Sequence, residues 1–278
     1  MYLNRTKSLS VHQRKDLVYV TFPSFDKTNL VHHCFSTRLG GVSGGIYKSL
    51  NLGFGRGDQD DCVTRNYEIL CNAIGVDSQA LIFSDQIHGT NIKVITEEDM
   101  KQRSNFLKGP EGIDGLVTNL QKVPLVTLYA DCVPLFFLDP IGKVVGLAHA
   151  GWRGTVNKIG EKMIKIFQER FDSNPKDILA GIGPSIGRCC FEVDEPVAIE
   201  FGKSFANGRN IVFPKDHNKY IIDLWEANKH TLVDGGIPFS NITVTDLCTM
   251  CNKDIFFSHR GHQGKRGSLA AIIEIKEE

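Results

Sequence analysis

The sequence predicts an α+β protein built as a layered α/β sandwich with mixed sheets, and three observations support this fold class. The 278 residues include 41% hydrophobic and 23% charged residues, which is typical of a globular chain that buries a large core. Many short apolar runs have the length and pattern of strands, whereas few segments have helical periodicity. Because strands and helices do not alternate strictly, a doubly wound Rossmann sheet is disfavoured.

The individual elements follow from the apolar patterns along the chain. Alternating or continuous apolar runs predict strands at 17–22, 30–36, 79–83, 91–96, 123–129, 133–138, 143–149, 177–182, 242–246 and 269–275. Helical periodicity predicts helices at 61–74, 155–171 and 223–234. Thr155 is positioned to be the N-cap of the second helix. No repeat or linker divides the chain, so we expect a single domain over residues 1–278.

Charge and composition exclude several classes of protein. The 32 basic and 32 acidic side chains cancel, so there is no electrostatic argument for nucleic acid or an anionic membrane as a partner. The longest purely apolar run, residues 133–138, is far shorter than the ~20 residues that cross a bilayer. The N-terminal segment lacks the apolar stretch of a secretory signal, so we expect a cytoplasmic protein. Its eight cysteines are then reduced thiols, available for metal binding or catalysis.

Three glycine-rich loops contain an arginine. They are residues 38–45, 53–57 and 151–154, with Arg38, Arg56 and Arg153. Glycine lets backbone N–H groups approach an anion, and a guanidinium adds a forked donor. These loops therefore predict a phosphate or carboxylate subsite, although tight turns with solvated arginines would give the same pattern. No P-loop and no dinucleotide-binding glycine motif is present.

Three metal-competent side chains stand at the ends of predicted strands. His88 follows the strand at 79–83, Cys132 lies between two strands, and His149 ends the strand at 143–149. Cys132 and His149 are separated by one strand, a turn and a returning strand, so a hairpin would place both at the same end of a sheet. A thiolate and two imidazoles form a three-ligand zinc site with an open fourth position. Cys132 and His149 could instead form a nucleophile and its base.

These motifs and their order resemble one known family, the YfiH/YlmD family. It is also called the multicopper polyphenol oxidoreductase or laccase-domain family, and the purine nucleoside phosphorylase family. The resemblance spans roughly residues 30–275 and leaves residues 1–29 outside it. The matching segments are 35–43 (FSTRLGGVS), 49–53 (SLNLG), 86–89 (QIHG), 113–118 (IDGLVT), 130–134 (ADCVP), 147–154 (LAHAGWRG), 183–190 (GPSIGRCC) and 256–260 (FFSHR).

The resemblance implies a fold and an activity. The fold is the layered sandwich shared with the catalytic domain of cytotoxic necrotizing factor, a cysteine-hydrolase-like fold. The activity is phosphorolysis of adenosine, inosine and 5′-methylthioadenosine, together with adenosine deamination. Purine nucleosides and phosphate would be the partners. The family's metal ligands fall on His88, Cys132 and His149, and the metal would be zinc, with copper also possible at the same site.

The resemblance also suggests roles for single residues. Phosphate and substrate would be bound by Arg38, Arg56, Arg153, Asn51 and Gln86. Ribose hydroxyls or proton transfer would involve Asp114 and Asp131, beside the catalytic Cys132 and His149. The C-terminal segment 259–268 departs from the family pattern, because Gly261 and Ser268 stand where relatives have arginine. Arg266, two positions before Ser268, could replace the second of these arginines.

Three other functions stay open. A multicopper laccase is disfavoured, because blue copper alone needs two histidines and a cysteine, and the nine histidines include no His-x-His pair for a copper cluster. The alternatives are a single copper that supports polyphenol oxidation, a metal-free Cys132–His149 amide hydrolase or deamidase, and a metal-stabilised binding protein.

Cys248-x-x-Cys251 would need a second cysteine pair to hold zinc. Cys189 and Cys190 are adjacent and hard to direct at one metal, so we expect spectator thiols there.

Overall fold

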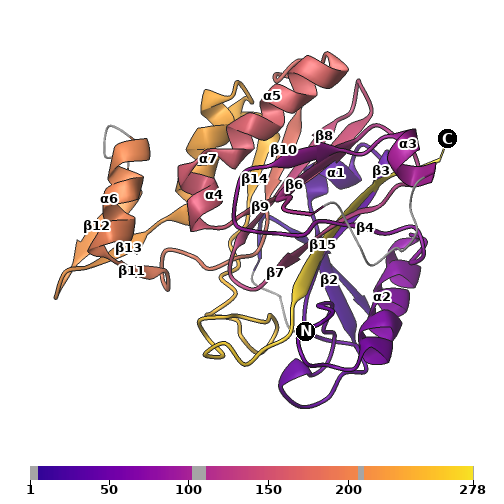
Figure 1. Ribbon diagram of the computed structural model, residues 1–278, viewed down its shortest axis with the longest axis horizontal. Coiled ribbons are helices and arrows are strands. Elements are labelled where there is room, and N and C mark those ends of the chain that lie inside the picture. Colours follow the sequence, from indigo (N-terminus) through magenta and orange to yellow (C-terminus); the bar gives the residue numbers. More distant parts are fainter. Residues whose placement is uncertain (1–5, 102–110, 206–209, 278) are drawn as a thin grey trace.

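Two six-stranded sheets form the centre of the fold, and helices lie on both sides of them (Figure 1). The computed structural model describes residues 6–101, 111–205 and 210–277. The first sheet has the order β1 (Ser10–Arg14), β2 (Leu17–Thr21), β3 (Val31–Ser36), β15 (Leu269–Ile275), β7 (Leu125–Tyr129), β4 (Ile82–Phe83). The second has the order β14 (Ile242–Val244), β10 (Leu179–Ile182), β8 (Val133–Asp139), β9 (Val144–Ala150), β6 (Gly115–Thr118), β5 (Ile92–Val94).

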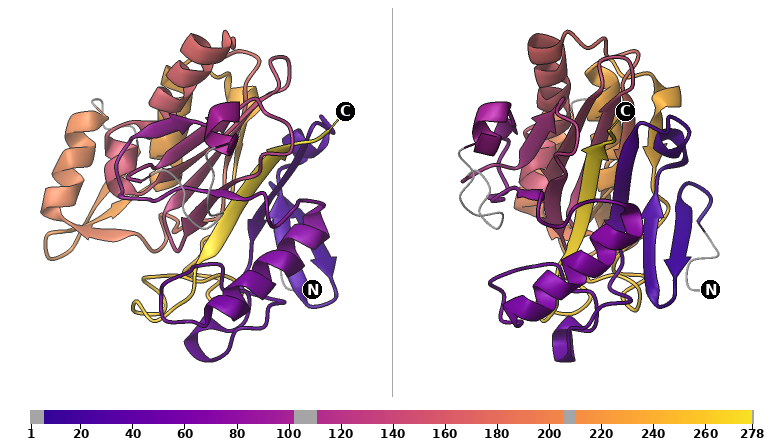
Figure 2. Two further views of the ribbon diagram at one scale, coloured as in Figure 1. Left: turned by 45° about the vertical axis from the view of Figure 1, so that its right-hand side comes forward. Right: turned by 90° about the vertical axis from the view of Figure 1, so that its right-hand side faces the viewer.

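The apolar side chains divide into three layers of core. Between the two sheets, Phe35 and Ile273 of the first sheet belong to the same cluster as Phe136 and Leu147 of the second. A further cluster joins the outer face of the first sheet to helix α2 (Asp60–Ile74). The outer face of the second sheet is covered by α5 (Ile159–Phe171) and α7 (Leu224–Asp234), as Figure 2 shows. The order helix, sheet, sheet, helix confirms the predicted layered sandwich with mixed sheets.

Each predicted strand overlaps an observed one, and β15 spans the whole of 269–275. The helix predicted at 155–171 is two helices, α4 (Trp152–Val156) and α5, because Lys158 between them has a left-handed backbone with φ 57°. Thr155 lies inside α4, so the prediction that it is an N-cap was wrong. Helix α7 begins with a side-chain cap, since Asp223 accepts a hydrogen bond from the Glu226 N–H at 3.0 Å.

Several short or half-exposed elements were not predicted. A small third sheet, in the order β11 (Glu192–Asp194), β13 (Lys219–Ile222), β12 (Val212–Lys215), lies beside α6 (Glu195–Ser204) at one end of the molecule (Figure 1). The others are β1, β6, α1 (Pro23–Asp26), α3 (Glu97–Lys101), and two 3-10 turns, Gly45–Tyr47 and Phe239–Asn241. Such segments are too short or too polar to show periodicity. Within the described ranges, no helix has the length and apolarity needed to span a bilayer.

Glu274 places a carboxyl group within strand β15. Its side chain is only 5% exposed, and burial together with the charge of Asp77 raises its pKa to about 7. The folded chain therefore retains a proton between pH 4.5 and 7 that the unfolded chain loses, so stability should fall as pH rises through this window. Glu274→Gln should raise the free energy of unfolding by about 1–3 kcal/mol at pH 8 and leave it unchanged at pH 4. Urea denaturation of both proteins at the two pH values checks this. Equal effects of the substitution at both would contradict it.

Candidate active site

Three side chains from separate segments meet at one end of the central strands of the second sheet. One donor atom each of His88, Cys132 and His149 lies within 4.8 Å of the other two. Cys132 immediately precedes β8, and His149 lies in β9 opposite Pro134 in the antiparallel β8–β9 hairpin. His88 belongs to the loop between β4 and β5. The hairpin that the spacing predicted therefore forms, and it brings Cys132 and His149 together.

A buried carboxylate orients both histidines. Asp114, just before β6, is 0% exposed, and its Oδ1 accepts hydrogen bonds from the His88 N–H at 3.0 Å and from Nδ1 of His149 at 2.8 Å. Its Oδ2 accepts from the N–H groups of Gly89 at 2.7 Å and Ile87 at 3.3 Å. These contacts stabilise His88 in a left-handed backbone conformation with φ 62°. Because Nδ1 of His149 is bound to Asp114, its Nε2 is the nitrogen left for the site.

The electrostatics couple Cys132 to its histidines. Burial raises the pKa of the Cys132 thiol, but the charge of His149 and hydrogen bonds from His149 and His88 outweigh burial and lower this pKa to about 6. Burial lowers the pKa of His149, but Cys132 and Asp114 raise it to about 9. The metal-free site therefore favours a thiolate beside an imidazolium. A divalent cation that displaces the imidazolium proton would find one sulfur and two nitrogen ligands, a donor set that suits zinc and copper.

The absence of a side chain at Gly151 leaves space next to His88, Cys132 and His149. A Cβ atom at this position would lie 3.0 Å from Cδ2 of His88, 3.3 Å from Sγ of Cys132 and 3.6 Å from Cε1 of His149. Any larger residue would therefore crowd the side chains of His88 and Cys132 and contact that of His149. The glycine that follows β9 keeps the room that a metal ion among them requires.

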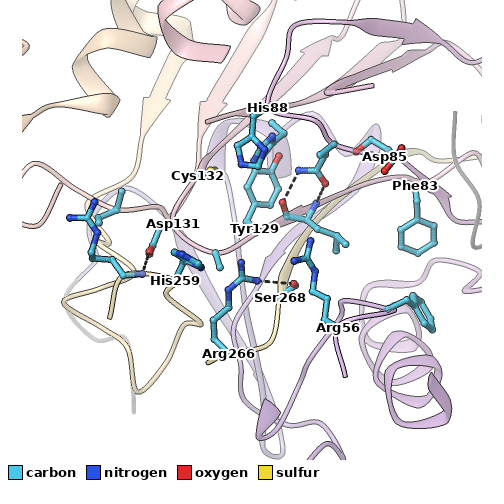
Figure 3. A pocket seen from close by; sticks show the side chains of 18 of the residues that line it. Arg56, Phe83, Asp85, His88, Tyr129, Asp131, Cys132, His259, Arg266 and Ser268 are labelled. Atoms are coloured by element: carbon cyan, nitrogen blue, oxygen red, sulfur yellow. Dashed lines mark hydrogen bonds between the residues drawn. The ribbon is translucent and has the colours of Figure 1, made fainter. Parts of the chain in front are cut away.

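A cavity of about 670 Å³ opens beside the trio (Figure 3). This volume is in the range of small-molecule sites. The residues that line it include the metal-competent group with Tyr129, an apolar wall, a wall of basic side chains, and the acidic residues Asp85, Glu111 and Asp131. The apolar wall includes Phe54, Phe83 and Leu128, and the basic wall includes Arg56, His259, Arg260 and Arg266.

Two arginines of the basic wall lie close enough to repel each other. The pKa of Arg266 is lowered by burial and by the charge of Arg56. Arg266 donates from Nη1 to the carbonyl of Gly267 at 3.1 Å and to Oγ of Ser268 at 3.2 Å, while its Nε–H is buried without a partner. Among the described residues, neither Arg56 nor Arg266 forms an ion pair. Two cations that face a cavity without a carboxylate partner form a site for an anion.

The structure brings some of the predicted site residues to this cavity and leaves others outside. His88, Cys132, His149, Asp131, Gln86 and Arg56 line it. Arg38, Arg153, Asn51 and Asp114 do not. Arg38 donates from Nε to the Lys48 carbonyl at 2.8 Å and packs its guanidinium 4.6 Å from the ring centre of Phe257. Arg153 lies over the ring of Trp152 at 4.3 Å. Arg38 and Arg153 therefore lie outside this cavity, and their assignment to phosphate binding stays a prediction.

In three further predicted residues, the polar side-chain atoms are hydrogen-bonded to the backbone or to neighbouring side chains. The two carboxylate oxygens of Asp131 accept from Oγ1 of Thr249 at 2.6 Å and from the Arg260 N–H at 2.7 Å. Both ends of the Gln86 amide pair with the backbone of Leu128, each at 2.8 Å. Oδ1 of Asn51 accepts from the N–H groups of Ser268 and Gly53. Asp131, Gln86 and Asn51 therefore shape the site by holding its loops.

Sequence reasoning assigned no role to Tyr129, His259 and Arg260, which line the cavity, and named Arg266 only as a possible replacement for a family arginine. The signals were present, because Tyr129 directly precedes the ADCVP motif and His259-Arg260 ends the FFSHR motif. Arg266 stands two positions before the serine that replaces a family arginine. Arg266 reaches the cavity because the strand that follows it, β15, pairs with β3 and β7 (Figure 1). Local sequence does not reveal these pairings.

The four remaining loop cysteines form a second cluster. The Sγ atoms of Cys189, Cys190, Cys248 and Cys251 all lie within 4.8 Å of one another. The expectation that Cys189 and Cys190 are hard to direct at one metal was wrong, because Sγ of each lies 3.3 Å from Sγ of Cys251. A turn at 188–190 allows both side chains to face the Cys-x-x-Cys segment.

Comparison with known proteins places the chain in a family. A family model described as multi-copper polyphenol oxidoreductase laccase matches residues 32–276. The chain is 39% identical over 249 residues to the purine nucleoside phosphorylase YlmD of Bacillus subtilis, which covers 87% of this chain and 88% of that protein. It is 36% identical over 232 residues to adenosine deaminase RL5 from an unknown prokaryotic organism, covering 81% and 87%. The crystal structure of YlmD from Geobacillus stearothermophilus matches with a TM-score of 0.88 at 34% identity, covering 96% of this chain and 99% of that one. The chain therefore belongs to the multi-copper polyphenol oxidoreductase laccase family.

Proposed function

We propose that this protein is a zinc-dependent purine nucleoside enzyme. It would cleave adenosine, inosine and 5′-methylthioadenosine with phosphate to the base and a ribose 1-phosphate or its thio analogue, and it would also deaminate adenosine. One observation carries the proposal: a metal-competent His–Cys–His group and an unpaired arginine pair line the same cavity. The names of relatives that are 39% and 36% identical support the same two activities.

Zinc would be held by His88, Cys132 and His149, with the cavity side left open. Bound there, zinc would supply a Lewis acid to the substrate. Asp114 fixes Nδ1 of His149 and the backbone of His88, so both ligands are oriented before the metal arrives. In this proposal Asp114 and Asp131 are positioning residues, because their oxygens are already hydrogen-bonded inside the protein.

Phosphate would bind between Arg56 and Arg266. The buried, unpartnered Nε–H of Arg266 gains a hydrogen bond when an anion oxygen approaches, and the anion relieves the repulsion between the two guanidinium groups. The nucleoside would occupy the space between this pair and the metal group, with Phe54 and Phe83 as an apolar wall for its rings. His259 lines the cavity and its imidazole forms no hydrogen bond within the described chain, so it is available to hydrogen-bond to substrate.

One structural feature favours a second candidate, a metal-free amide hydrolase. Cys132, His149 and Asp114 have the order of nucleophile, base and orienting carboxylate, and the low pKa of Cys132 suits a nucleophile. The two functions differ in what they need from Cys132. A hydrolase requires a free thiolate, so zinc would inhibit it, whereas the nucleoside enzyme requires zinc.

The test is to incubate the zinc-loaded protein with adenosine, with and without phosphate, and to separate the products. We expect adenine only when phosphate is present and inosine in both cases. Hydrolysis of an amide substrate that rises when a chelator removes the metal would favour the hydrolase. Copper loading would separate the remaining alternative: weak polyphenol oxidation that is lost in Cys132→Ser fits one copper at this site, whereas a blue-copper band with four coppers per chain would contradict it.

A further inference from the structure

The four-cysteine cluster lies outside the cavity and has no part in the proposed chemistry. Cys189 and Cys190 belong to the loop that follows β10, and Cys248 and Cys251 belong to the loop that follows β14. The two loops run alongside each other, because Ser185 and Cys248 form an isolated parallel bridge and the Thr249 N–H donates to the Ser185 carbonyl at 3.0 Å. Cys190 and Cys251 are 61 positions apart in sequence. The cluster therefore joins two distant segments.

The spacing of the sulfurs suits a metal ion. A tetrahedral zinc with Zn–S bonds of about 2.3 Å places its sulfurs roughly 3.8 Å apart. The sulfurs of the cluster are all within 4.8 Å, with the two nearest contacts at 3.3 Å. These contacts are much longer than the ~2.05 Å of a disulfide bond. Small side-chain rotations would bring all four sulfurs to one zinc, whereas a disulfide would use two and leave two.

Backbone N–H groups also stabilise a thiolate at Cys248. Sγ of Cys248 accepts hydrogen bonds from the N–H of Gly187 at 3.3 Å and from the N–H of Cys251. Backbone N–H groups around a cysteine sulfur stabilise the negative charge that a metal ligand carries. Cys248 is buried at the base of the cluster, while Cys189 and Cys251 are exposed. An ion would therefore enter from solvent and be closed in by the exposed pair.

We propose that Cys189, Cys190, Cys248 and Cys251 bind one zinc ion as a closed four-thiolate site, with each thiol releasing its proton on binding. The site is structural, because no position is left for substrate. It would clamp the two loops that hold Asp131, whose carbonyl accepts from the Ile186 N–H at 2.9 Å and whose carboxylate accepts from Thr249. Asp131 is the residue before Cys132, and both line the cavity, so the zinc site would also stabilise this part of the cavity wall.

The test is the zinc content of the full chain and of serine variants. We expect two zinc ions per wild-type chain, one in Cys251→Ser, one in Cys189→Ser, and one in Cys132→Ser. Cys62→Ser is the matched control, since Cys62 is a partly exposed thiol on α2 and lies in neither group, and it should keep two. Circular dichroism of each variant verifies that it is folded.

Cobalt absorption provides a second readout, which reports the thiolate ligands directly. Cobalt-loaded Cys132→Ser should show the intense thiolate-to-metal absorption of four sulfur ligands, and cobalt-loaded Cys251→Ser should lose most of it. Full zinc retention in both Cys189→Ser and Cys251→Ser would overturn the proposal. So would a thiol titration of the unreduced, denatured, chelated protein that finds fewer than eight free thiols. If zinc remains in Cys132→Ser but nucleoside turnover is absent from wild type, the four-cysteine site stands and the proposed function fails.

Discussion

Asp114→Asn should weaken zinc binding at the His–Cys–His site by about 10- to 100-fold, the usual loss when a residue that orients metal ligands is replaced. The carboxylate accepts four N–H groups, and one of them belongs to the ring of a ligand histidine. An amide presents only one oxygen, so buried donors would lose a partner and the free energy of unfolding should also fall by about 1–3 kcal/mol.

Asp139→Asn is the matched control for this prediction. Asp139 is 2% exposed, lies at the opposite end of the same β8–β9 hairpin, and accepts the N–H groups of Ile141 and Gly142. It should lose stability and keep its zinc affinity. Competition with a chromophoric chelator, performed in a Cys251→Ser background so that one site is read, measures the affinity. Equal zinc affinities of the Asp114 and Asp139 variants would show that Asp114 only stabilises the fold.

Arg266→Met should separate the two proposed activities. Losing one charge-assisted hydrogen bond worth about 1.5–3 kcal/mol lowers phosphate affinity by roughly 10- to 150-fold. Deamination of adenosine involves no phosphate, so it should fall much less. The readouts are the KM for phosphate in phosphorolysis and the rate of inosine formation from adenosine in phosphate-free buffer.

Arg38→Met serves as its control. Arg38 is also half-buried, but its guanidinium contacts the Lys48 and Lys253 carbonyls and the face of Phe257 outside the cavity. Its replacement should lower the two activities by the same factor, through stability alone. A selective loss of phosphate use in the Arg38 variant, with Arg266→Met unaffected, would return the phosphate role to the first glycine loop.

The meeting of Cys132 and His149 in the metal-competent trio could be predicted because the geometry of these two residues is local. Cys132 and His149 flank one hairpin, whose antiparallel register places them at the same end regardless of how the rest folds. His88 is further away in sequence, and its assignment relied on its own strand-end position together with the family motif. The layered sandwich was predictable for a similar reason, since apolar runs such as 133–138 and 269–275 are buried on both faces.

The positions of Arg38 and Arg266 relative to the cavity could not be predicted because they depend on long-range packing. A glycine loop around Arg38 looks like an anion site, but the fold brings Phe257 and the Lys253 carbonyl to it from the far end of the chain. Arg266 reaches the cavity because its segment precedes β15, which inserts between two strands formed early in the sequence. The cysteine cluster has the same origin, since only the pairing of β10 with β14 brings the two loops together.

The most direct test of the proposed function uses inosine, which has no amino group to lose, so phosphorolysis is read alone. Phosphorus NMR and base chromatography would follow zinc-loaded wild type and Cys132→Ser with inosine and inorganic phosphate. We expect ribose 1-phosphate and hypoxanthine in equal amounts from the wild type only when phosphate is present, and neither from the variant. Hypoxanthine released without phosphate, or unchanged turnover in Cys132→Ser, would contradict a metal-dependent phosphorolytic site at His88, Cys132 and His149.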